Sequence, residues 1–308
     1  MPERRAAESD RDSIRWGAGR RMEFIEFKLY WEGRINRGDL TRTFNISHPQ
    51  ASADLSRYLE KAPGNMDYDR SAKHYFATPR FKPAFIEPNA EQHLMQLRLT
   101  LSPVAYSCFM PFGGEPGPNA DIVSLPVRSI EPDILRRILG AIKSSKAMHI
   151  AYQSMNRPES TLRWITPHAL GFDGFRWHVR AYCHDDNRFK DFLLGRVISV
   201  QEDKPASLDS AMDLEWHHHV FLKIGPHPGL SDAQKEIIAH DYGMKDRLAM
   251  IRVRLALHFY LVWNLRLEEG DVDRPAKSQQ IVLLNREEIQ KEVAQVRLKM
   301  NEMIRHQS

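Results

Sequence analysis

The hydrophobic pattern of the chain changes its period partway along, and this change limits the fold more than any other feature. Between residues 21 and 62, apolar residues recur every three or four positions, which indicates helices. Between residues 148 and 200 they recur every second position, which indicates strands. At about 150 residues per domain, 308 residues suggest about two domains, or three small ones. We therefore expect a multi-domain α+β protein.

Three helices are predicted in the first region, over Arg21–Gly33, over Arg37–Asn45 and after Pro49. Ser47 is a good N-cap for the third helix, and Pro49 falls in its first turn, where a missing N–H costs nothing. The third helix has one apolar stripe, formed by Ala51, Leu55, Tyr58, Leu59 and Ala62. Its other side is small and polar, as required of a helix that enters the major groove of DNA. The pattern predicts a helix-turn-helix.

The polar side of the third helix and a following hairpin supply candidate DNA contacts. The hairpin is predicted over Met66–Phe76 and would form a basic wing. Gln50 can make two hydrogen bonds to adenine, Arg57 can reach guanine or phosphate, and serine hydroxyls can bond phosphate oxygens. The predicted contact set is Ser47, His48, Gln50, Ser52, Ser56, Arg57, Arg70 and Lys73. A small three-helix unit with a hairpin and no DNA role remains the alternative.

Positive charge is concentrated in the same two regions. Residues 1–83 carry 16 basic and 12 acidic side chains, and residues 141–200 carry 9 and 5, so each segment has a net charge of +4. Residues 84–140 carry 4 basic and 6 acidic side chains, and residues 201–308 carry 15 basic and 17 acidic ones. Each of these two segments therefore has a net charge of −2. The distribution suits two anion-facing modules joined by a nearly neutral scaffold.

In the second region, strands are predicted over His149–Met155, Leu162–Leu170, Phe175–Cys183 and Phe189–Leu194. Asp173-Gly174 is a hairpin-turn signal. The third strand is expected to turn one face to the core, formed by Phe175, Trp177, Val179, Ala181 and Cys183. The other face holds Arg176, His178, Arg180 and Tyr182. Its two arginines could present their guanidinium groups to one anionic ligand, with simple solvent exposure as the alternative.

The remaining segments are expected to connect and extend these modules. Pro132 opens a predicted helix over Asp133–Lys143, after a loop over Phe112–Pro118 that lacks a phosphate-binding motif. In the C-terminal third, strands are predicted over Val220–Ile224, Ala249–Ala256 and Tyr260–Arg266, and helices over Ser231–Asp241 and Arg286–Arg305. The last helix has a seam for its own chain or a partner chain, formed by Ile289, Val293, Val296, Met300 and Met303.

Several protein classes find no support in the sequence. No run approaches the roughly 18 apolar residues of a membrane helix, and residues 1–20 are too charged for a signal peptide, so a cytoplasmic location is expected. Cys108 and Cys183 are expected to be reduced apolar residues. Adjacent residues in His217-His218-His219 point to opposite faces of a strand and cannot all bind one ion. No metal, cofactor or catalytic residue is therefore expected.

The second region resembles the WYL domain, a small Sm-like β-barrel. The family pattern is a proline-led strand with a glycine turn, a tryptophan strand and a later strand ending in arginine. Those motifs are here Pro167–Gly174, Arg176–Arg180 and Phe192–Val197. The Trp-His-x-Arg form, with His178 and Val179 in place of the tyrosine and leucine of the name, is most similar to phage-defence-island regulators of the BrxR and CapW type. Those proteins combine a winged helix-turn-helix, a WYL domain and a C-terminal extension.

This resemblance covers nearly the whole chain and implies its organisation. It implies a winged helix-turn-helix domain over 1–110, a linker and connecting helix over 111–145, a WYL domain over 146–204 and a small α/β dimerisation extension over 205–308. The family's pocket positions map onto Tyr152, Ser154, His168, Arg176, His178, Arg180 and Arg196. Trp177 is expected to support the pocket from the core. The implied ligand is a small anion, a nucleotide or an oligonucleotide.

The expected function is a homodimeric transcription regulator, a repressor of a phage-defence operon, that binds double-stranded promoter DNA and senses this ligand. Two alternatives remain open. An accessory protein could bind RNA or single strands with the barrel itself. A phosphodiesterase could use His168 and His178 as acid and base.

Overall fold

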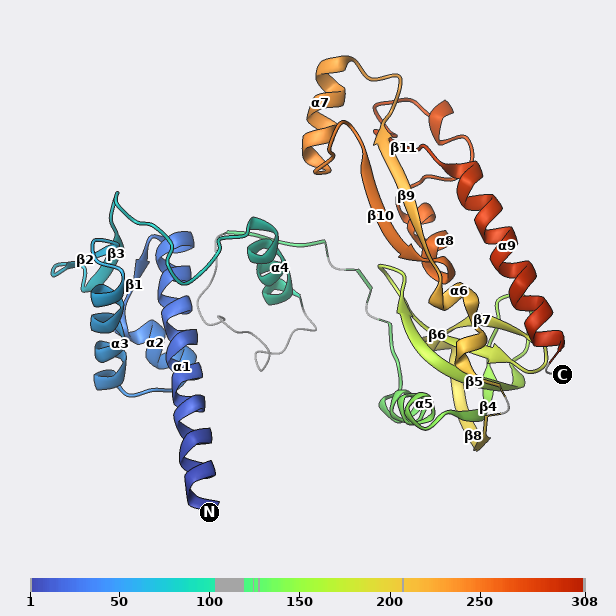
Figure 1. Cartoon of the computed structure of the whole chain (residues 1–308), viewed down its shortest axis with the longest axis horizontal. Helices are drawn as coiled ribbons and strands as arrows, with labels where there is room; N and C mark the ends of the chain where they lie inside the picture. Colours follow the sequence, from blue (N-terminus) through green and yellow to red (C-terminus); the bar gives the residue numbers. More distant parts are fainter. Residues whose placement is uncertain (1, 103–118, 124, 127, 207, 307–308) are drawn as a thin grey trace. The chain divides into compact units, whose positions relative to one another are not determined.

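The computed structural model describes residues 2–102, 119–123, 125–126, 128–206 and 208–306, with side chains from residue 17 onward. It divides into two compact units, Met1–Leu125 and Pro126–Ser308. Figure 1 shows a mainly helical first unit with a small sheet and a second unit built around two sheets. Cys108 and the predicted Phe112–Pro118 loop lie outside the described residues. Within the described ranges, no helix has both the length and the apolar character needed to cross a membrane.

The first unit begins with the three predicted helices, α1 (Pro2–Glu32), α2 (Arg37–Phe44) and α3 (His48–Lys61). The start of α1 lies well before the predicted Arg21 because apolar periodicity marks only the part that packs. The predicted cap of α3 is confirmed, since the Ser47 hydroxyl accepts the Gln50 amide at 3.3 Å. At the start of α2, the side chain of Asn36 forms a capping box with Asp39, which the sequence analysis did not identify.

A small antiparallel sheet completes this part of the unit. Its strands are β1 (Arg34–Ile35), β2 (Met66–Asp69) and β3 (His74–Ala77), in the order β1-β3-β2. The β2–β3 hairpin lies where the wing was predicted. A further helix, α4 (Ala90–Leu101), follows and was not predicted.

A buried carboxylate joins the helices to the segment after the hairpin. Glu26 accepts the Tyr58 hydroxyl at 2.8 Å and the backbone N–H groups of residues 84 to 86. Asn65 donates to the Tyr58 hydroxyl at 3.1 Å. Burial, together with Glu26, raises the pKa of Tyr58. These contacts fix α3 against α1, so the outer face of α3 belongs to a rigid unit.

The second unit opens with α5 (Pro132–Ser144), which packs on a five-stranded sheet. Its strands are β4 (Lys146–Tyr152), β5 (Thr161–Phe172), β6 (Trp177–Cys183), β7 (Arg188–Leu193) and β8 (Val197–Pro205). The order is β7-β6-β5-β4-β8, and all neighbours are antiparallel. The Asp173-Gly174 turn is confirmed, with Gly174 at φ 91°. Among the described strands no ladder joins β7 to β8, so these pairings do not establish the closed barrel.

The expected division of β6 into a core face and an open cationic face is wrong. Every residue from His178 to Cys183 is buried, whereas Trp177 is 47% exposed and Phe175 is 37% exposed. The cause is a second layer, because residues of the C-terminal part cover the side of β6 that carries Arg180. Trp177 lies at the turn end of the β5–β6 hairpin, opposite Phe172.

The C-terminal part forms a second sheet with helices. Its strands follow the order β10-β9-β11, with β9 at His219–Pro226, β10 at Ala249–Arg254 and β11 at Ile281–Leu283. Its helices are α6 (Leu214–His217), α7 (Asp232–Asp241), α8 (Leu255–Asn264) and α9 (Arg286–Arg305). The predicted strand over Tyr260–Arg266 is wrong, since α8 occupies most of it. Its sequence is apolar nearly throughout, and periodicity cannot separate a strand from a helix in such a run.

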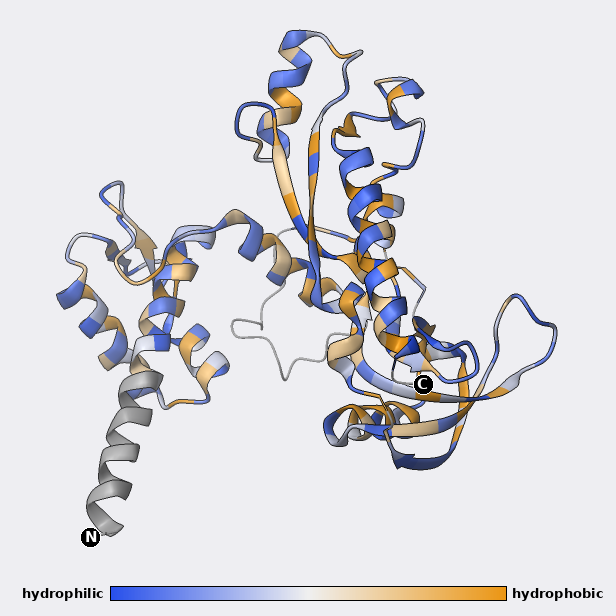
Figure 2. Ribbon diagram, turned by 45° about the vertical axis from the view of Figure 1, so that its right-hand side comes forward, coloured by the Kyte–Doolittle hydropathy of each residue, from blue (hydrophilic) through white to orange (hydrophobic). Residues whose placement is uncertain are grey.

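The last helix, α9, has the predicted bounds and packs within its own chain. Ile289, Val293 and Val296 contact the core of the C-terminal sheet, and Met300 contacts a cluster that includes Tyr182 of β6. Figure 2 shows hydrophobic positions interspersed along this mostly hydrophilic helix. The helix therefore joins both sheets of the second unit.

Candidate functional site

α3 presents its predicted DNA-contact residues at the surface of the first unit. The opposite side of the helix is core, where Leu55 and Tyr58 are fully buried. On the outer side, the exposed members of the predicted set are Ser47, His48, Ser56 and Arg57, and the partly exposed members are Gln50 and Ser52. All six lie where a nucleic acid could reach them.

A buried ion pair supports this face. The Nε of Arg21 on α1 donates to Asp54 of α3 at 2.6 Å, and the Asp54 side chain is fully buried. Asp54 also accepts from Gln50 at 3.2 Å, which orients the Gln50 amide and leaves its oxygen and one N–H free for a base. Arg57 lies 3.8 Å from Asp54 with its side chain 47% exposed. Sequence reasoning missed this pair, although an acidic residue beside the apolar stripe was a signal.

The hairpin carries the other two predicted DNA contacts. Arg70 and Lys73 are exposed in the turn between β2 and β3. Asp69 accepts the backbone N–H groups of Ser71 and Ala72 at 2.8 and 3.0 Å, and these bonds lower the pKa of Asp69. The turn is thereby ordered, with both cations at its tip.

The predicted ligand residues do not form one cluster. Tyr152 is buried, and its hydroxyl accepts the Leu193 amide at 3.2 Å. Ser154 lies in the turn after β4, where its hydroxyl accepts the Asn156 amide at 3.2 Å. These two residues shape the sheet end, and the remaining five divide between a buried network and an open cavity.

Arg180 is the centre of the buried network. Its guanidinium donates to Asp213 at 2.7 and 2.9 Å and to Glu215 at 2.7 Å, and its side chain is 5% exposed. Burial alone would lower the pKa of Arg180, but the bond to Asp213 and the charge of Asp213 outweigh burial and raise it. Glu215 also accepts from Arg297 of α9 at 2.6 Å. The network therefore ties β6 to α9.

Both predicted histidines are buried and bonded to carboxylates. His168 Nε2 lies 2.9 Å from Asp213, and His178 Nε2 lies 2.8 Å from Asp173. Burial opposes ionisation of Asp173, yet hydrogen bonds from His178 and from two backbone N–H groups lower the pKa of Asp173 to about 2. Tyr260 of α8 covers His178, with ring centroids 4.7 Å apart.

The last two predicted ligand residues, Arg176 and Arg196, line one open cavity of about 270 Å³. The sequence analysis did not identify two other parts of this cavity, Arg128 and the exposed face of Trp177. Arg128, which precedes α5, brings a third guanidinium group, and the exposed Trp177 ring forms part of the wall. Three guanidinium groups beside an aromatic ring can bind a phosphate and stack a base.

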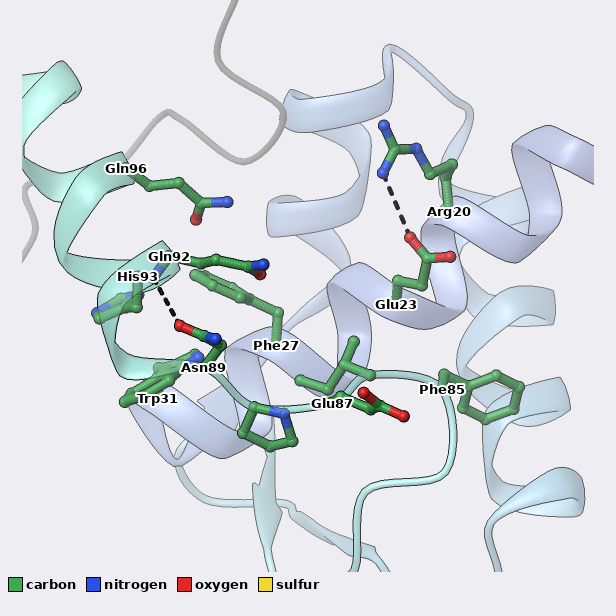
Figure 3. Close-up of a pocket in the computed structure, with 12 residues that line it drawn as sticks. Arg20, Glu23, Phe27, Trp31, Phe85, Glu87, Asn89, Gln92, His93 and Gln96 are labelled. Carbon is green, nitrogen blue, oxygen red and sulfur yellow. Dashed lines mark hydrogen bonds and ion pairs between the residues drawn. The ribbon is translucent and has the colours of Figure 1, made fainter. Parts of the chain in front are cut away.

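A larger cavity of about 480 Å³ lies in the first unit between α1 and α4. Figure 3 shows Trp31 and His93 at one side of it and Arg20 with Glu23 at the other. The Trp31 and His93 rings stack with centroids 4.3 Å apart. No predicted site residue lines this cavity.

The His217-His218-His219 run does not converge on one point. The His217 ring lies 3.2 Å from the Ser210 carbonyl, whereas the His218 ring lies 2.6 Å from Glu292. In the part of the chain that the structure describes, no group of three or more candidate ligands could hold a metal ion.

Three family models match the chain in succession. Residues 17–99 match the BrxR transcriptional regulator winged helix-turn-helix domain. Residues 133–202 match the WYL domain, and residues 219–289 match the BrxR transcriptional regulator C-terminal dimerization domain.

Whole-chain relatives agree with this order of domains. A DNA-binding transcriptional repressor CapW of Escherichia coli (strain KTE188) is 37% identical over 92% of this chain and 94% of its own length. The CapW repressors of Stenotrophomonas maltophilia and Pseudomonas aeruginosa are each 38% identical over 91% of this chain, and over 94% and 93% of their own lengths. The chain therefore belongs to the CapW family, with a BrxR-type winged helix, a WYL domain and a BrxR-type C-terminal dimerization domain.

Proposed function

We propose that this protein is a sequence-specific repressor of transcription that binds double-stranded promoter DNA as a homodimer. The outer face of α3 carries the proposal, because it combines Gln50, Arg57 and small polar residues on a helix fixed by the Arg21–Asp54 pair. The relatives named as DNA-binding transcriptional repressors support it. Such a role would place the protein in the cytoplasm with the chromosome.

In this proposal α3 enters the major groove. The free oxygen and N–H of the Gln50 amide suit adenine, and the exposed Arg57 suits guanine or a phosphate. Ser47, Ser52 and Ser56 would bond phosphate oxygens beside the groove. Arg70 and Lys73 at the hairpin tip would contact the backbone and add affinity without sequence preference.

Dimerisation is assigned to the C-terminal part, which matches a dimerization domain. Two copies would place two α3 helices on two half-sites of one operator. We expect the operator to be a palindrome for this reason.

We further propose that the cavity with Arg176 and Arg196 senses a nucleotide or nucleic-acid-like anion. Tyr152 would act indirectly, since it holds Leu193, which lines the cavity. Arg180 and the two histidines would secure the C-terminal part to the sheet. A closed Sm-like barrel and control of a phage-defence operon are finer proposals that rest on the resemblance.

One observation favours the single-strand alternative, namely the exposed Phe172 and Trp177 rings, which lie 5.0 Å apart next to the arginine cavity. Such a pair could stack bases. The phosphodiesterase alternative is disfavoured, because the His168 and His178 side chains are only 8% and 4% exposed.

Fluorescence anisotropy tests the proposal. The full-length protein is titrated onto the duplex upstream of its own gene, a scrambled duplex and the corresponding single strand, at two salt concentrations. We expect a preference for the native duplex that persists at the higher salt, because nonspecific phosphate binding falls steeply with salt. Equal binding to both duplexes, or tighter binding to the single strand, would contradict it.

A further inference from the structure

We propose that residues 128–130, which lie before the matched WYL region, form one wall of the arginine cavity. In this proposal Arg128 binds a ligand phosphate together with Arg176 and Arg196. The inference rests on the proposed ligand sensing and names a further binding residue for it. It also assigns the ligand a chemistry, that of a single phosphorylated nucleoside.

Three contacts hold this segment against the sheet. The Arg128 guanidinium lies over the Phe175 ring, 4.6 Å from its centroid. The Ser129 carbonyl oxygen would lie 3.1 Å from a Cβ at Gly195, so the close approach depends on the missing side chain of Gly195. Ile130 packs against the sheet core. The segment is therefore positioned by the fold.

The charges around the cavity favour an anion. Arg176 is paired with Asp173 at 2.9 Å. For Arg128 and Arg196, by contrast, no acidic partner exists among the residues that the structure describes. Arg180, which donates to three carboxylates, shows how this fold neutralises a guanidinium that is not meant for a ligand. Two uncompensated cations facing one cavity match the charge of a phosphate monoester.

The size and wall of the cavity define the rest of the ligand. Its volume of about 270 Å³ is just below the roughly 300 Å³ at which small-molecule sites begin. One nucleotide unit fits this size better than several. The exposed Trp177 ring can stack a base while the arginines hold the phosphate. This chemistry could come from a free mononucleotide or from the phosphorylated end of an oligonucleotide.

Residues 128–130 follow closely on the first unit, which ends at Leu125. Because Ser129 and Ile130 are already packed against the sheet, a bound phosphate would restrain only the Arg128 side chain within this segment. Such a ligand changes DNA affinity only if it binds one of two states of the protein more tightly than the other.

Calorimetric titration of the full-length protein tests the inference with defined probes. The probes are AMP, adenosine, inorganic phosphate and a dinucleotide with or without a 5′ phosphate. We expect AMP to bind more tightly than adenosine or phosphate, and the 5′ phosphate to tighten dinucleotide binding. Binding of only the phosphorylated dinucleotide would also support the site and would identify the oligonucleotide end as the source. If neither AMP nor the phosphorylated dinucleotide binds, the inference is overturned.

Substitutions then test the residue assignment. Arg128→Gln should weaken binding of the phosphorylated probe by about tenfold or more, because a charge-assisted hydrogen bond is lost. The matched control is Arg188→Gln, which removes an exposed charge at the opposite end of β7 from Leu193 and should leave binding unchanged. Wild-type binding by Arg128→Gln would overturn the inference.

Two further variants separate position from charge. Gly195→Ala keeps all three arginines but displaces Ser129. It should therefore also weaken binding of the phosphorylated probe. Trp177→Phe should retain most of the binding that Trp177→Ala loses. Promoter affinity without a probe should be unchanged in the Arg188→Gln control. A wild-type protein that does not bind the promoter would count against the proposed function. The proposed role of Arg128 is decided by the probe titrations alone.

Discussion

The two cationic regions of the chain have the same net charge and opposite structural fates. On α3 of the first unit, the Arg57 side chain is 47% exposed and has, among the described residues, only one distant acidic neighbour, Asp54 at 3.8 Å. On β6 of the second unit, the Arg180 side chain is 5% exposed and bonded to Asp213 and Glu215, which lie 33 and 35 residues further along the chain. An arginine pattern therefore predicts an anion site only where the fold leaves the guanidinium exposed, and not where several carboxylates bury it.

The largest expected effect is on stability and belongs to Arg180. Arg180→Ala should lower the free energy of unfolding by about 3–5 kcal/mol, because it removes a buried cation from Asp213 and Glu215. Among the described residues, these carboxylates would keep only His168 and Arg297 as side-chain partners. Arg57→Ala should change it by less than about 0.5 kcal/mol. Urea unfolding of both variants measures the difference. Equal stability of the two would remove the contrast between the regions.

The next effect concerns DNA affinity and belongs to Arg57. Arg57→Ala should weaken binding to the native duplex by about 1–3 kcal/mol through the loss of a base or phosphate contact. Arg188→Ala is the control, since it removes another exposed charge, from the second unit. A similar loss in both variants would mean that only net charge matters.

The buried network also predicts a pH dependence. The pKa of Asp173 is lowered from 3.8 to about 2, so its carboxylate stabilises the fold above about pH 4 and this contribution is lost as the pH falls toward 2. The lowered pKa of Asp213 acts in the same direction. Asp173→Asn should flatten the decline in urea midpoint between pH 5 and pH 3. An unchanged decline would exclude Asp173 as a source.

The smallest effect is expected at the hairpin tip. Arg70→Ala and Lys73→Ala should each reduce the slope of log affinity against log salt by about 1, because each removes one phosphate contact. The ratio of native to scrambled binding should stay the same. A changed ratio would show that the hairpin reads bases.

Features set by neighbouring residues were predictable from the sequence. The Ser47 cap, the Ser231 cap of α7 and the bounds of α9 all follow from local signals. Features set by distant residues were not. α8 was predicted as a strand because its apolar run has no clear period, and the exposure of Trp177 depends on which parts of β6 the C-terminal part covers.

The candidate sites divide in the same way. The outer face of α3 follows from its own apolar stripe, so the exposed contact residues could be named without a structure. The role of Arg21 could not be predicted from the sequence, because its partner Asp54 lies 33 residues away. Arg128 lies outside the recognised motif and joins Arg176 and Arg196 only in the folded chain.

The most direct test of the account is the specificity of Gln50→Ala and Arg57→Ala on the native and scrambled duplexes, measured by anisotropy at a fixed salt concentration. We predict that the ratio of native to scrambled affinity falls toward one in both variants while scrambled-duplex affinity changes less. An unchanged ratio in well-folded variants would show that α3 is not the reading helix and would contradict the account.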